Sequence, residues 1–355
     1  MAQETTHSLS DPAVELTNIQ VDFDNNTILN DLTFSLEAGQ ILCLLGPSGC
    51  GKTTALKTIA GLINANKGQI ELFGHSVISN TPMPFDERPV GFIFQDYALF
   101  PHMTVSQNIA YGLNRLSKQE KQLRIQETLA LVELPGIDKR FPHELSGGQQ
   151  QRVAVARALA PKPQILLMDE PFSNIDGQVK RRMMADLRSL LKNHNITCVF
   201  VTHAKEEAFA FADKTAVMVN GQIAQLDTPA MVFNKPKTLA VAKFMESGNL
   251  ASLPHCQQVL DKVNHQWPKD LNNSGYWLFK PQHISIKRSQ QNTGIQLLSS
   301  TYTGRAYQYD ISIRVDTRNP DKIILWKAES ENVLELSAGD NLSIEYKAFP
   351  HWLLN

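Results

Sequence analysis

The sequence predicts an α/β domain built on a mostly parallel sheet, followed by a smaller all-β domain. From Ile41 to Val219, apolar strand-like runs alternate with helical stretches, as in a parallel sheet covered by helices. Beyond about Met245 this rhythm stops and short strand-like segments follow one another. A glycine-rich loop at 46–54 joins an apolar strand to a helix, the arrangement of a phosphate-binding loop. The 355 residues allow two or three domains, each with its own core.

The composition is that of an ordinary globular protein, with 42% hydrophobic and 19% charged residues. A net charge of -1 gives no general attraction to nucleic acid or to an anionic membrane. No run approaches the roughly 18 apolar residues that span a bilayer, and Met1 to Ser10 has no signal-peptide core. Reduced cytosolic thiols are expected, since no CxxC pair occurs among Cys43, Cys50, Cys198 and Cys256.

The chain begins with two predicted strands, Val14 to Val21 and Thr27 to Leu36, which have alternating apolar positions and a turn-rich connection. Phe23 precedes the turn. An aromatic residue there can belong to the core or can stack on a base, and its position alone favours the core.

The phosphate loop follows the apolar strand Ile41 to Leu45 and precedes a helix over Ala55 to Ala60. Glycines let successive backbone N–H groups curl around a phosphate, and the helix N-terminus adds positive potential. Lys52 can reach the outer phosphates, and the Thr53 hydroxyl can bind Mg²⁺. The alternative, a chance glycine turn, does not explain the flanking strand and helix. We therefore expect an ATP or GTP site made by Gly46, Pro47, Ser48, Gly49, Cys50, Gly51, Lys52, Thr53 and Thr54.

Cys50 lies in this loop, among backbone amides and close to Lys52. Such surroundings favour the thiolate form of a cysteine. The sequence therefore predicts that alkylation of Cys50 blocks nucleotide binding and that ATP protects the thiol.

Two further strands are predicted, Gly68 to Gly74 and Val90 to Phe94, the second ending at Gln95. A polar residue directly after a buried strand stands where ligand sites form in open α/β sheets. From about Tyr97 to Pro161 the pattern becomes helical, with a capping box at Ser117 to Glu120. We expect a helical insertion there.

Within that insertion, Leu145 to Arg152 leads into a helix over Val153 to Leu159. Two glycines ahead of a helix can expose backbone donors at its positive end and form a second anion cradle. Alternatively, Ser146 is an N-cap with a flexible lead-in. The chemistry of the residues favours neither interpretation.

Two more strands end in polar residues. Pro163 to Met168 ends in Asp169 and Glu170, which can hold Mg²⁺ and orient the attacking water. A solvated acidic turn is the alternative. Cys198 to Val201 ends in Thr202 and His203, and this histidine either contacts a γ-phosphate or is structural.

Asn220-Gly221 then predicts a hairpin with a type I′ turn between Thr215–Val219 and Gln222–Leu226.

The C-terminal part contains a helix to about Met245 and then segments of strand character. These predict a small β-barrel or sandwich that serves regulation, dimer contact or plain stabilisation. Its predicted strands are Tyr276–Phe279, Ile284–Ile286, Ile295–Leu298, Tyr307–Val315, Lys322–Trp326 and Asn341–Tyr346.

Six segments occur in the order and approximate spacing of the ATP-binding subunits of ABC transporters, and the chain resembles that family over residues of about 14 to 240. In the family's terms they are the loop at 46–54 (Walker A), Gln95 (Q-loop), Leu145–Arg152 (signature), Ile165–Glu170 (Walker B), Ser173–Asp176 (D-loop) and His203 (H-loop). The signature is highly specific. The D-loop departs from the usual pattern at Asn174-Ile175 but retains Asp176, so we expect activity.

The resemblance extends to the importer branch with a C-terminal regulatory domain of the TOBE type. Phe279 to Ile284 looks like that domain's arginine-proline-glutamate motif, with Lys280 and Gln282 substituted. Ferric-iron importers are most similar in three segments, although maltose, spermidine and sulfate ATPases share much of them: Phe100–Val105, Asn108–Leu113 and Arg140–Leu145.

The resemblance implies a RecA-like P-loop NTPase cassette at 14–240, with a helical subdomain at about 97–161, and an OB-like β domain at 250–355. It implies a head-to-tail homodimer in which ATP lies between the phosphate loop of one copy and the signature of the other. Phe23 would contact adenine, which outweighs the core interpretation. Further nucleotide contacts are implied for Ser146, Gly147, Gly148, Gln149 and Asp176.

In that arrangement Thr53, Gln95 and Asp169 would hold Mg²⁺, while Glu170 polarises water. His203 would sense the γ-phosphate, and Lys52 would contact it. The partners implied are integral-membrane permease subunits, docked near Gln95 to Val105, and indirectly a periplasmic substrate-binding protein. The subunit would then be peripheral, at the cytoplasmic face of the inner (plasma) membrane.

Alternatives concern both the substrate and the class of protein. The same role in a spermidine/putrescine, sulfate, molybdate or sugar importer stays open, because this subunit does not touch the cargo. An ABC ATPase acting on ribosomes or nucleic acid is a remote alternative, since the chain has one cassette and no basic stretch. A non-catalytic subunit is disfavoured by Lys52, Glu170 and His203.

Overall fold

The computed structural model describes residues 12–24, 26–78, 82–173, 175, 177–252, 275–314, 323–348 and 351–353. The chain divides into two compact units, Met1–Val232 and Phe233–Asn355. The domain limits expected from the sequence remain predictions beside this division. Within the described part of the chain, no helix has the length and apolar character needed to cross a bilayer.

The centre of the first unit is a six-stranded sheet in the order β10-β9-β3-β8-β7-β6, which confirms the α/β class. Five neighbouring strands run parallel, and β10 pairs antiparallel with β9. The predicted hairpin is present, with Asn220 at φ 49° and Gly221 at φ 77°, as a type I′ turn requires. The strands are β3 (Ile41–Leu45), β6 (Val90–Ile93), β7 (Ile165–Asp169), β8 (Thr197–Thr202), β9 (Lys214–Val219) and β10 (Gln222–Asp227).

A second, antiparallel sheet has the order β2-β1-β4-β5. The sequence predicts three of these strands but not their separation from the central sheet. The burial patterns distinguish the two sheets. Strand β2 of the antiparallel sheet alternates between buried and exposed positions, whereas β3, β7 and β8 of the central sheet are buried throughout. One face of the antiparallel sheet therefore meets the core. Its strands are β1 (Val14–Phe23), β2 (Asn26–Leu36), β4 (Lys67–Leu72) and β5 (His75–Ser76).

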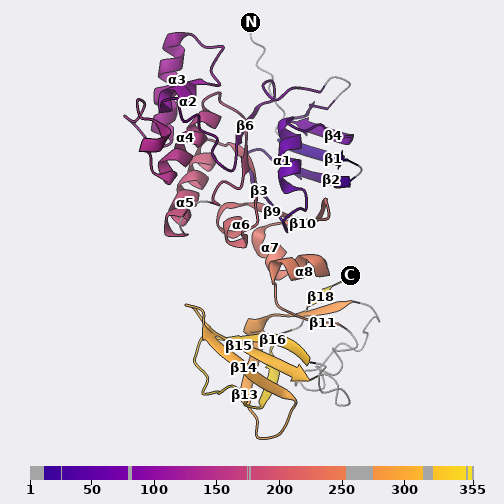
Figure 1. Cartoon of the computed structure of the whole chain (residues 1–355). Helices are drawn as coiled ribbons and strands as arrows, with labels where there is room; N and C mark the ends of the chain where they lie inside the picture. The colour runs from indigo at the N-terminus through magenta and orange to yellow at the C-terminus, as the bar shows by residue number, and fades with distance from the viewer. Residues whose placement is uncertain are drawn as a thin grey trace. The chain divides into compact units, whose positions relative to one another are not determined.

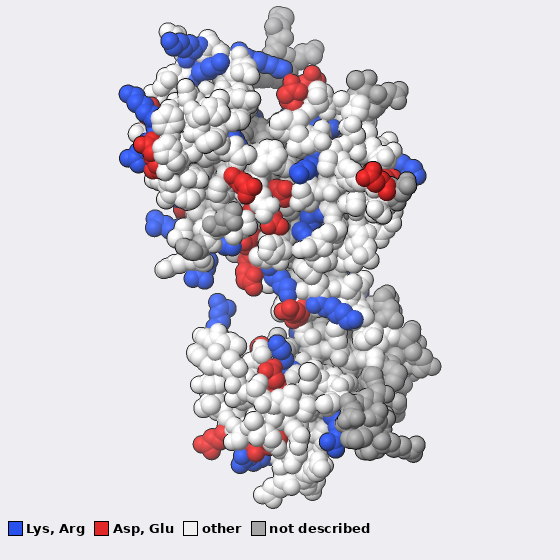
Figure 2. Space-filling model, viewed as in Figure 1, with Lys and Arg blue, Asp and Glu red and all other residues white. Residues whose placement is uncertain are grey.

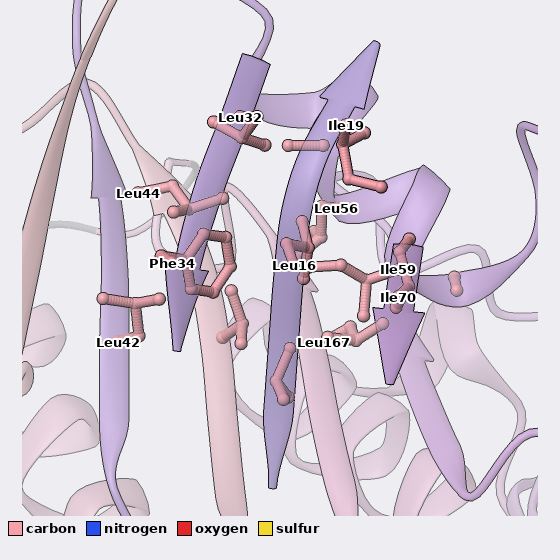
Figure 3. Close-up of a cluster of buried hydrophobic side chains, with 14 of the residues drawn as sticks. Leu16, Ile19, Leu32, Phe34, Leu42, Leu44, Leu56, Ile59, Ile70 and Leu167 are labelled. Carbon is pink, nitrogen blue, oxygen red and sulfur yellow. The ribbon is translucent and has the colours of Figure 1, made fainter. Parts of the chain in front are cut away.

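Helix α1 (Lys52–Ala60) lies in the core that the two sheets share (Figure 1). Figure 3 shows Leu56 and Ile59 of α1 close to side chains from both sheets. At the end of α1, the buried guanidinium of Arg88 donates to Thr58 O at 3.0 Å and to Ile59 O. A cation there satisfies carbonyls at the negative end of the helix dipole.

The predicted insertion is helical, and no strand occurs in 97–161, a span that the structure describes without gaps. The capping box is confirmed, since Ser117 N donates to Glu120 Oε2 at 2.8 Å and Glu120 N donates to Ser117 Oγ. In the helix that this box caps, Leu129 is buried whereas Leu123 is 59% exposed. The helices are α2 (Val105–Ala110), α3 (Lys118–Leu131), η1 (Pro142–Glu144) and α4 (Gly147–Leu159), followed later in the chain by α5 (Gly177–Asn193), α6 (Lys205–Phe211) and α7 (Pro229–Asn234).

The second unit is rich in strands around its own apolar core, which confirms the all-β prediction for this part. In β15 the predicted alternation buries Tyr309, Ile311 and Ile313. The expected strand residues Val315 and Lys322 lie outside the described residues. The elements are α8 (Leu239–Met245), β11 (Asn249–Ser252), β12 (Tyr276–Phe279), η2 (Pro281–His283), β13 (Ile284–Arg288), β14 (Ile295–Tyr302), β15 (Tyr307–Arg314), β16 (Ile323–Ser330), β17 (Leu342–Tyr346) and β18 (His351–Leu353).

Lys280 connects the helical start of this unit to its strands. The side chain is buried, and its ammonium donates to Phe233 O at 2.8 Å and to Ser247 O at 2.6 Å. The ammonium also lies 4.3 Å from the centre of the Phe233 ring. Burial lowers the pKa of Lys280 to about 8. Desolvation therefore destabilises the charged form of Lys280 in the folded unit.

The free energy of unfolding of this unit should rise between pH 8 and pH 9.5 because of Lys280. The pKa of Lys280 is about 8 in the fold and about 10.5 when unfolded, so the folded unit loses its proton first and higher pH favours it. Tryptophan fluorescence during urea unfolding measures this unit selectively, because all four tryptophans follow residue 260. A Lys280→Arg variant keeps its charge and should lack the rise. Parallel pH profiles for the two proteins would contradict the assignment.

Candidate nucleotide-binding and catalytic site

The phosphate loop is held in its conformation by glycines that no other residue can replace without strain. Gly49 and Gly51 have φ of 81° and 96°, in the left-handed region. A Cβ on Gly51 would lie 2.7 Å from Leu29, and one on Gly46 would lie 2.4 Å from Met218 O. Pro47, Ser48 and Gly49 are exposed, so the rim of the loop is open to solvent at the N-terminus of α1. This geometry suits an anion.

Lys52 lies inside the curve of the loop. Its Nζ donates to Gly46 O and to Pro47 O, each at 2.9 Å, and the residue is 7% exposed. The loop thus presents an ammonium together with the backbone at the start of α1. Both groups favour a negatively charged ligand.

Thr53 and Asp169 meet at the edge of the loop, from the first turn of α1 and the end of β7. Thr53 Oγ1 donates to Asp169 Oδ1 at 2.9 Å. Burial raises the pKa of Asp169, and the bond from Thr53 opposes that shift. Hydroxyl and carboxylate oxygens are ligands that Mg²⁺ prefers, but no described group of three or more His, Cys, Asp or Glu could hold a metal. The residues fit a magnesium ion that takes its other ligands from phosphate and water.

Three polar side chains converge at the ends of adjacent strands. Gln95 follows β6, Glu170 follows β7 and His203 follows β8, and these strands are neighbours in the sheet. Gln95 Nε2 donates to Glu170 Oε2 at 3.3 Å, while His203 Nδ1 lies 3.3 Å from Glu170 Oε1. The side chain of His203 is 61% exposed, so it is not a core histidine. A carboxylate between an amide and an imidazole, beside the phosphate loop, can orient a water molecule.

Phe23 is 46% exposed at the end of β1. The core interpretation that its position favours is therefore wrong. Asp24, with φ 45°, turns the chain directly after it and leaves the ring at the surface. An exposed ring at this strand end can stack on a base.

The signature segment forms the start of α4, which begins earlier than the sequence predicts. Ser146 is the N-cap: Gln149 N donates to Ser146 Oγ at 3.4 Å, and Ser146 N donates to Gln149 Oε1 at 3.1 Å. Nothing lies within 4 Å of a Cβ built on Gly147, so the surroundings within the chain do not require glycine there. The capping interpretation is confirmed, and the anion cradle stays a prediction.

The structure does not bring every expected residue to one place. No hydrogen bond between described residues joins Ser146, Gly147, Gly148 or Gln149 to the loop at 46–54. Asp176 and Asn174 lie outside the described residues. Within a single chain, the described site consists of the phosphate loop and the three strand ends.

Cys50 does not have the surroundings expected from its neighbours in sequence. It is 6% exposed, and its Sγ would lie 2.8 Å from a Cβ on Gly46, so the thiol packs beneath the loop. Burial raises the pKa of Cys50, although Lys52 Nζ, 3.9 Å away, lowers it. The predicted thiolate is therefore wrong, because burial outweighs the nearby charge.

Comparisons with known proteins agree with this geometry. Residues 29–173 match the ABC transporter family. Fe(3+) ions import ATP-binding proteins are 41% identical in Pectobacterium atrosepticum (80% of this chain, 77% of the relative), 40% in Rhizobium etli (86% and 89%) and 36% in Photorhabdus laumondii (96% and 97%). In the solved structure of cbiO1 from Clostridium perfringens, part of the ABC transporter complex cbiONQ, the match has a TM-score of 0.59 at 25% identity. It covers 64% of this chain and 92% of that one.

The fold and site define a P-loop ATPase of the ABC class. The chain belongs to the ABC transporter family, among its ATP-binding proteins.

The thiol of Cys50 should react slowly in the native protein, because it is buried and its pKa is raised. A Cys256→Ser variant leaves Cys43, Cys50 and Cys198, all of which are buried. With Ellman's reagent, all three should react far more slowly in buffer than in urea, and ATP should change the native rate little. A single fast thiol that ATP protects, and that Cys50→Ala removes, would restore the original expectation.

Proposed function

We propose that this chain is the ATP-hydrolysing subunit of an ABC importer for ferric iron. The choice of ferric iron rests on the similarity to Fe(3+) import ATP-binding proteins. At 36% identity, this similarity extends over 349 residues and through both compact units. The assembled residues at the phosphate loop support hydrolysis. In such an importer the ATPase subunit does not contact the transported substrate, so the substrate is assigned from this sequence similarity alone.

In this proposal the triphosphate of ATP lies on the phosphate loop, and Lys52 turns from the carbonyls of Gly46 and Pro47 to the outer phosphates. Phe23 stacks on the adenine. A Mg²⁺ ion held by Thr53, Gln95 and Asp169 supplies charge neutralisation for the phosphates. The contact between Thr53 and Asp169 already places two of these three side chains together.

Glu170 is the residue that orients and polarises the attacking water. Its two carboxylate oxygens face Gln95 and His203, so its direction is defined from both sides. His203 contacts the γ-phosphate from the neighbouring strand end. These roles require no covalent intermediate, only positioning and electrostatic stabilisation.

A second copy of the chain completes the site. The open start of α4, with Ser146, Gly147, Gly148 and Gln149, faces the nucleotide of the partner in a head-to-tail homodimer, and Asp176 contributes beside it. The space around Gly147 supports this, since the chain itself leaves it open. ATP binding then drives dimerisation.

Permease subunits in the membrane dock near Gln95 to Val105, and closure of the ATPase dimer moves them through this contact. Phe94, Gln95 and Asp96 are exposed there, next to the helical insertion. The ATPase is peripheral, at the cytoplasmic face of the inner (plasma) membrane, and a periplasmic binding protein delivers iron to the permeases from the opposite side.

Importers for polyamines, sulfate, molybdate or sugars remain the second candidate, because sequence segments are shared among these branches. The support for an ABC ATPase that acts on ribosomes or nucleic acid is weaker. Figure 2 shows Lys and Arg dispersed among acidic and uncharged residues on the viewed face, and the net charge is -1. Nucleic-acid binding proteins usually concentrate basic residues in a patch or stripe.

Glu170→Gln should bind ATP but lose at least about a hundredfold in turnover, because the amide cannot polarise water as a carboxylate does. Phosphate release measures turnover, and a fluorescent ATP analogue measures binding. Size-exclusion chromatography with ATP should show the variant as a dimer. Glu133→Gln, an exposed carboxylate outside the site, is the matched control. Normal turnover in Glu170→Gln would remove Glu170 from its role.

The reconstituted transporter should hydrolyse ATP faster with an iron-loaded periplasmic binding protein than with the iron-free form. The loaded protein contacts the permeases and shifts them toward the state that promotes closure of the ATPase dimer. Sugar-loaded and polyamine-loaded binding proteins are the controls. Stimulation by one of these, and not by the iron-loaded protein, would overturn the choice of ferric iron.

A further inference from the structure

We propose that Gln151 is a positioning residue that ties the start of α4 to the Glu170 turn. This inference rests on the proposed function, because Glu170 is taken as the catalytic carboxylate. Gln151 itself contacts neither the phosphate loop nor Glu170. It acts through the backbone of Pro171.

The connection is one buried hydrogen bond. Gln151 Nε2 donates to Pro171 O at 2.8 Å, and the residue is 1% exposed. Gln151 lies five positions after the N-cap Ser146, so it belongs to the rigid part of the helix that carries the signature. Pro171 directly follows Glu170. The bond therefore crosses from the signature helix to the backbone that carries the carboxylate.

The Glu170 turn needs such support. Glu170 has φ 44°, which is strained for a residue with a side chain. Three other bonds fix the turn: Glu170 N donates to Val201 O at 3.1 Å, and Ser173 donates to Glu170 O through Oγ at 3.1 Å and through its backbone N at 3.3 Å. The first bond connects the turn to β8, and the other two lie within the turn. Gln151 supplies the tie to α4.

Among the described residues, the Gln151 side chain acts only as a donor. Its Oε1 has no hydrogen-bond partner among the described residues. Gln151 lines a cavity of about 250 Å³ between α4 and α5, together with Val155, Met183 and Leu187. Polar residues also line the cavity, among them Glu133, Arg152 and Asp186, but in the described structure the hydrogen bond of the Gln151 side chain is the one to Pro171 O.

Neighbouring polar contacts of α4 do not duplicate this link. Arg152 pairs with Glu133 at 2.9 Å and with Asp186 at 2.7 Å, which connects α4 to the end of α3 and to α5. Gln150 Nε2 donates to Pro142 O at 2.9 Å, within the helical insertion. Neither reaches the Glu170 turn.

The consequence is a coupling between two ATP sites. In the proposed dimer, the start of α4 contacts the partner's nucleotide, whereas Glu170 acts on the nucleotide of its own chain. A shift of α4 when the partner binds ATP is passed through Gln151 to Pro171, and so to the carboxylate. Occupancy of one site thereby positions the base of the other.

The test compares steady-state ATP hydrolysis by full-length wild type, Gln151→Met and Gln151→Glu, with Thr128→Val as the matched control, because Thr128 is a buried donor within α3 and outside the proposed site. Methionine keeps the length and loses the donor. We expect about a tenfold lower kcat and a Hill coefficient for ATP near one, with unchanged affinity for a fluorescent ATP analogue. Thr128→Val should retain both kinetic parameters.

The glutamate variant separates a lost donor from a damaged core. A protonated carboxyl can donate to Pro171 O and an ionised one cannot. Burial and the carboxylates of Glu133 and Asp186 favour the protonated form, whereas Arg152, which pairs with both, and His194, when charged, favour the ionised form. Lowering the pH increases the protonated fraction in either case. The activity of Gln151→Glu relative to wild type should therefore rise from pH 8 to pH 6, while that of Gln151→Met stays constant.

Wild-type kcat and Hill coefficient in Gln151→Met would overturn the proposal. So would a loss of analogue binding in both variants without pH recovery, which indicates a purely structural role. The proposed function fails by a different result. If the wild-type chain does not hydrolyse ATP, or if Glu170→Gln turns over normally, the ATPase assignment is wrong whatever the Gln151 variants do.

Discussion

The burial of α1 between two sheets is the constraint on which the first unit depends. Leu56 and Ile59 pack into a core shared by the antiparallel and central sheets, so the helix is confined from both sides. Arg88 binds the carbonyls at its C-terminal end, and the glycine loop holds its start. Burial of such side chains contributes roughly 1.5–3 kcal/mol each. A rigid helix keeps Lys52 and Thr53 at fixed positions, which an anion site needs.

The parallel order of β6, β7 and β8 explains how one carboxylate acquires two polar neighbours. Parallel strands end at the same edge, and adjacent strands place the first or second residue after each strand within hydrogen-bond reach. Gln95 and His203 thus meet Glu170 although they are 75 and 33 residues away in sequence. The start of α4 contributes differently. It offers an exposed, capped helix end to another molecule and a buried amide to its own chain.

The second unit has a separate core and its own polar anchor. Lys280 is buried, and its ammonium binds two carbonyls at the helical start of the unit. A lysine can lose its proton near pH 8, whereas an arginine cannot. The contacts of this anchor therefore depend on pH in this range, which contacts made by an arginine would not.

By itself, the sequence determined the two fold classes and their order along the chain, the phosphate loop and the polar residues at the strand ends. These follow from period-2 alternation, from glycine and from the residues that directly follow apolar runs, all of which are local. Only the tertiary structure decided that β1, β2 and β4 form a separate sheet, that Phe23 lies at the surface and that Cys50 is buried beneath its loop. It also decided the contacts of Gln151 with Pro171 and of Arg88 with α1. The reason is that burial and partners depend on residues 20 or more positions away, which no local pattern records.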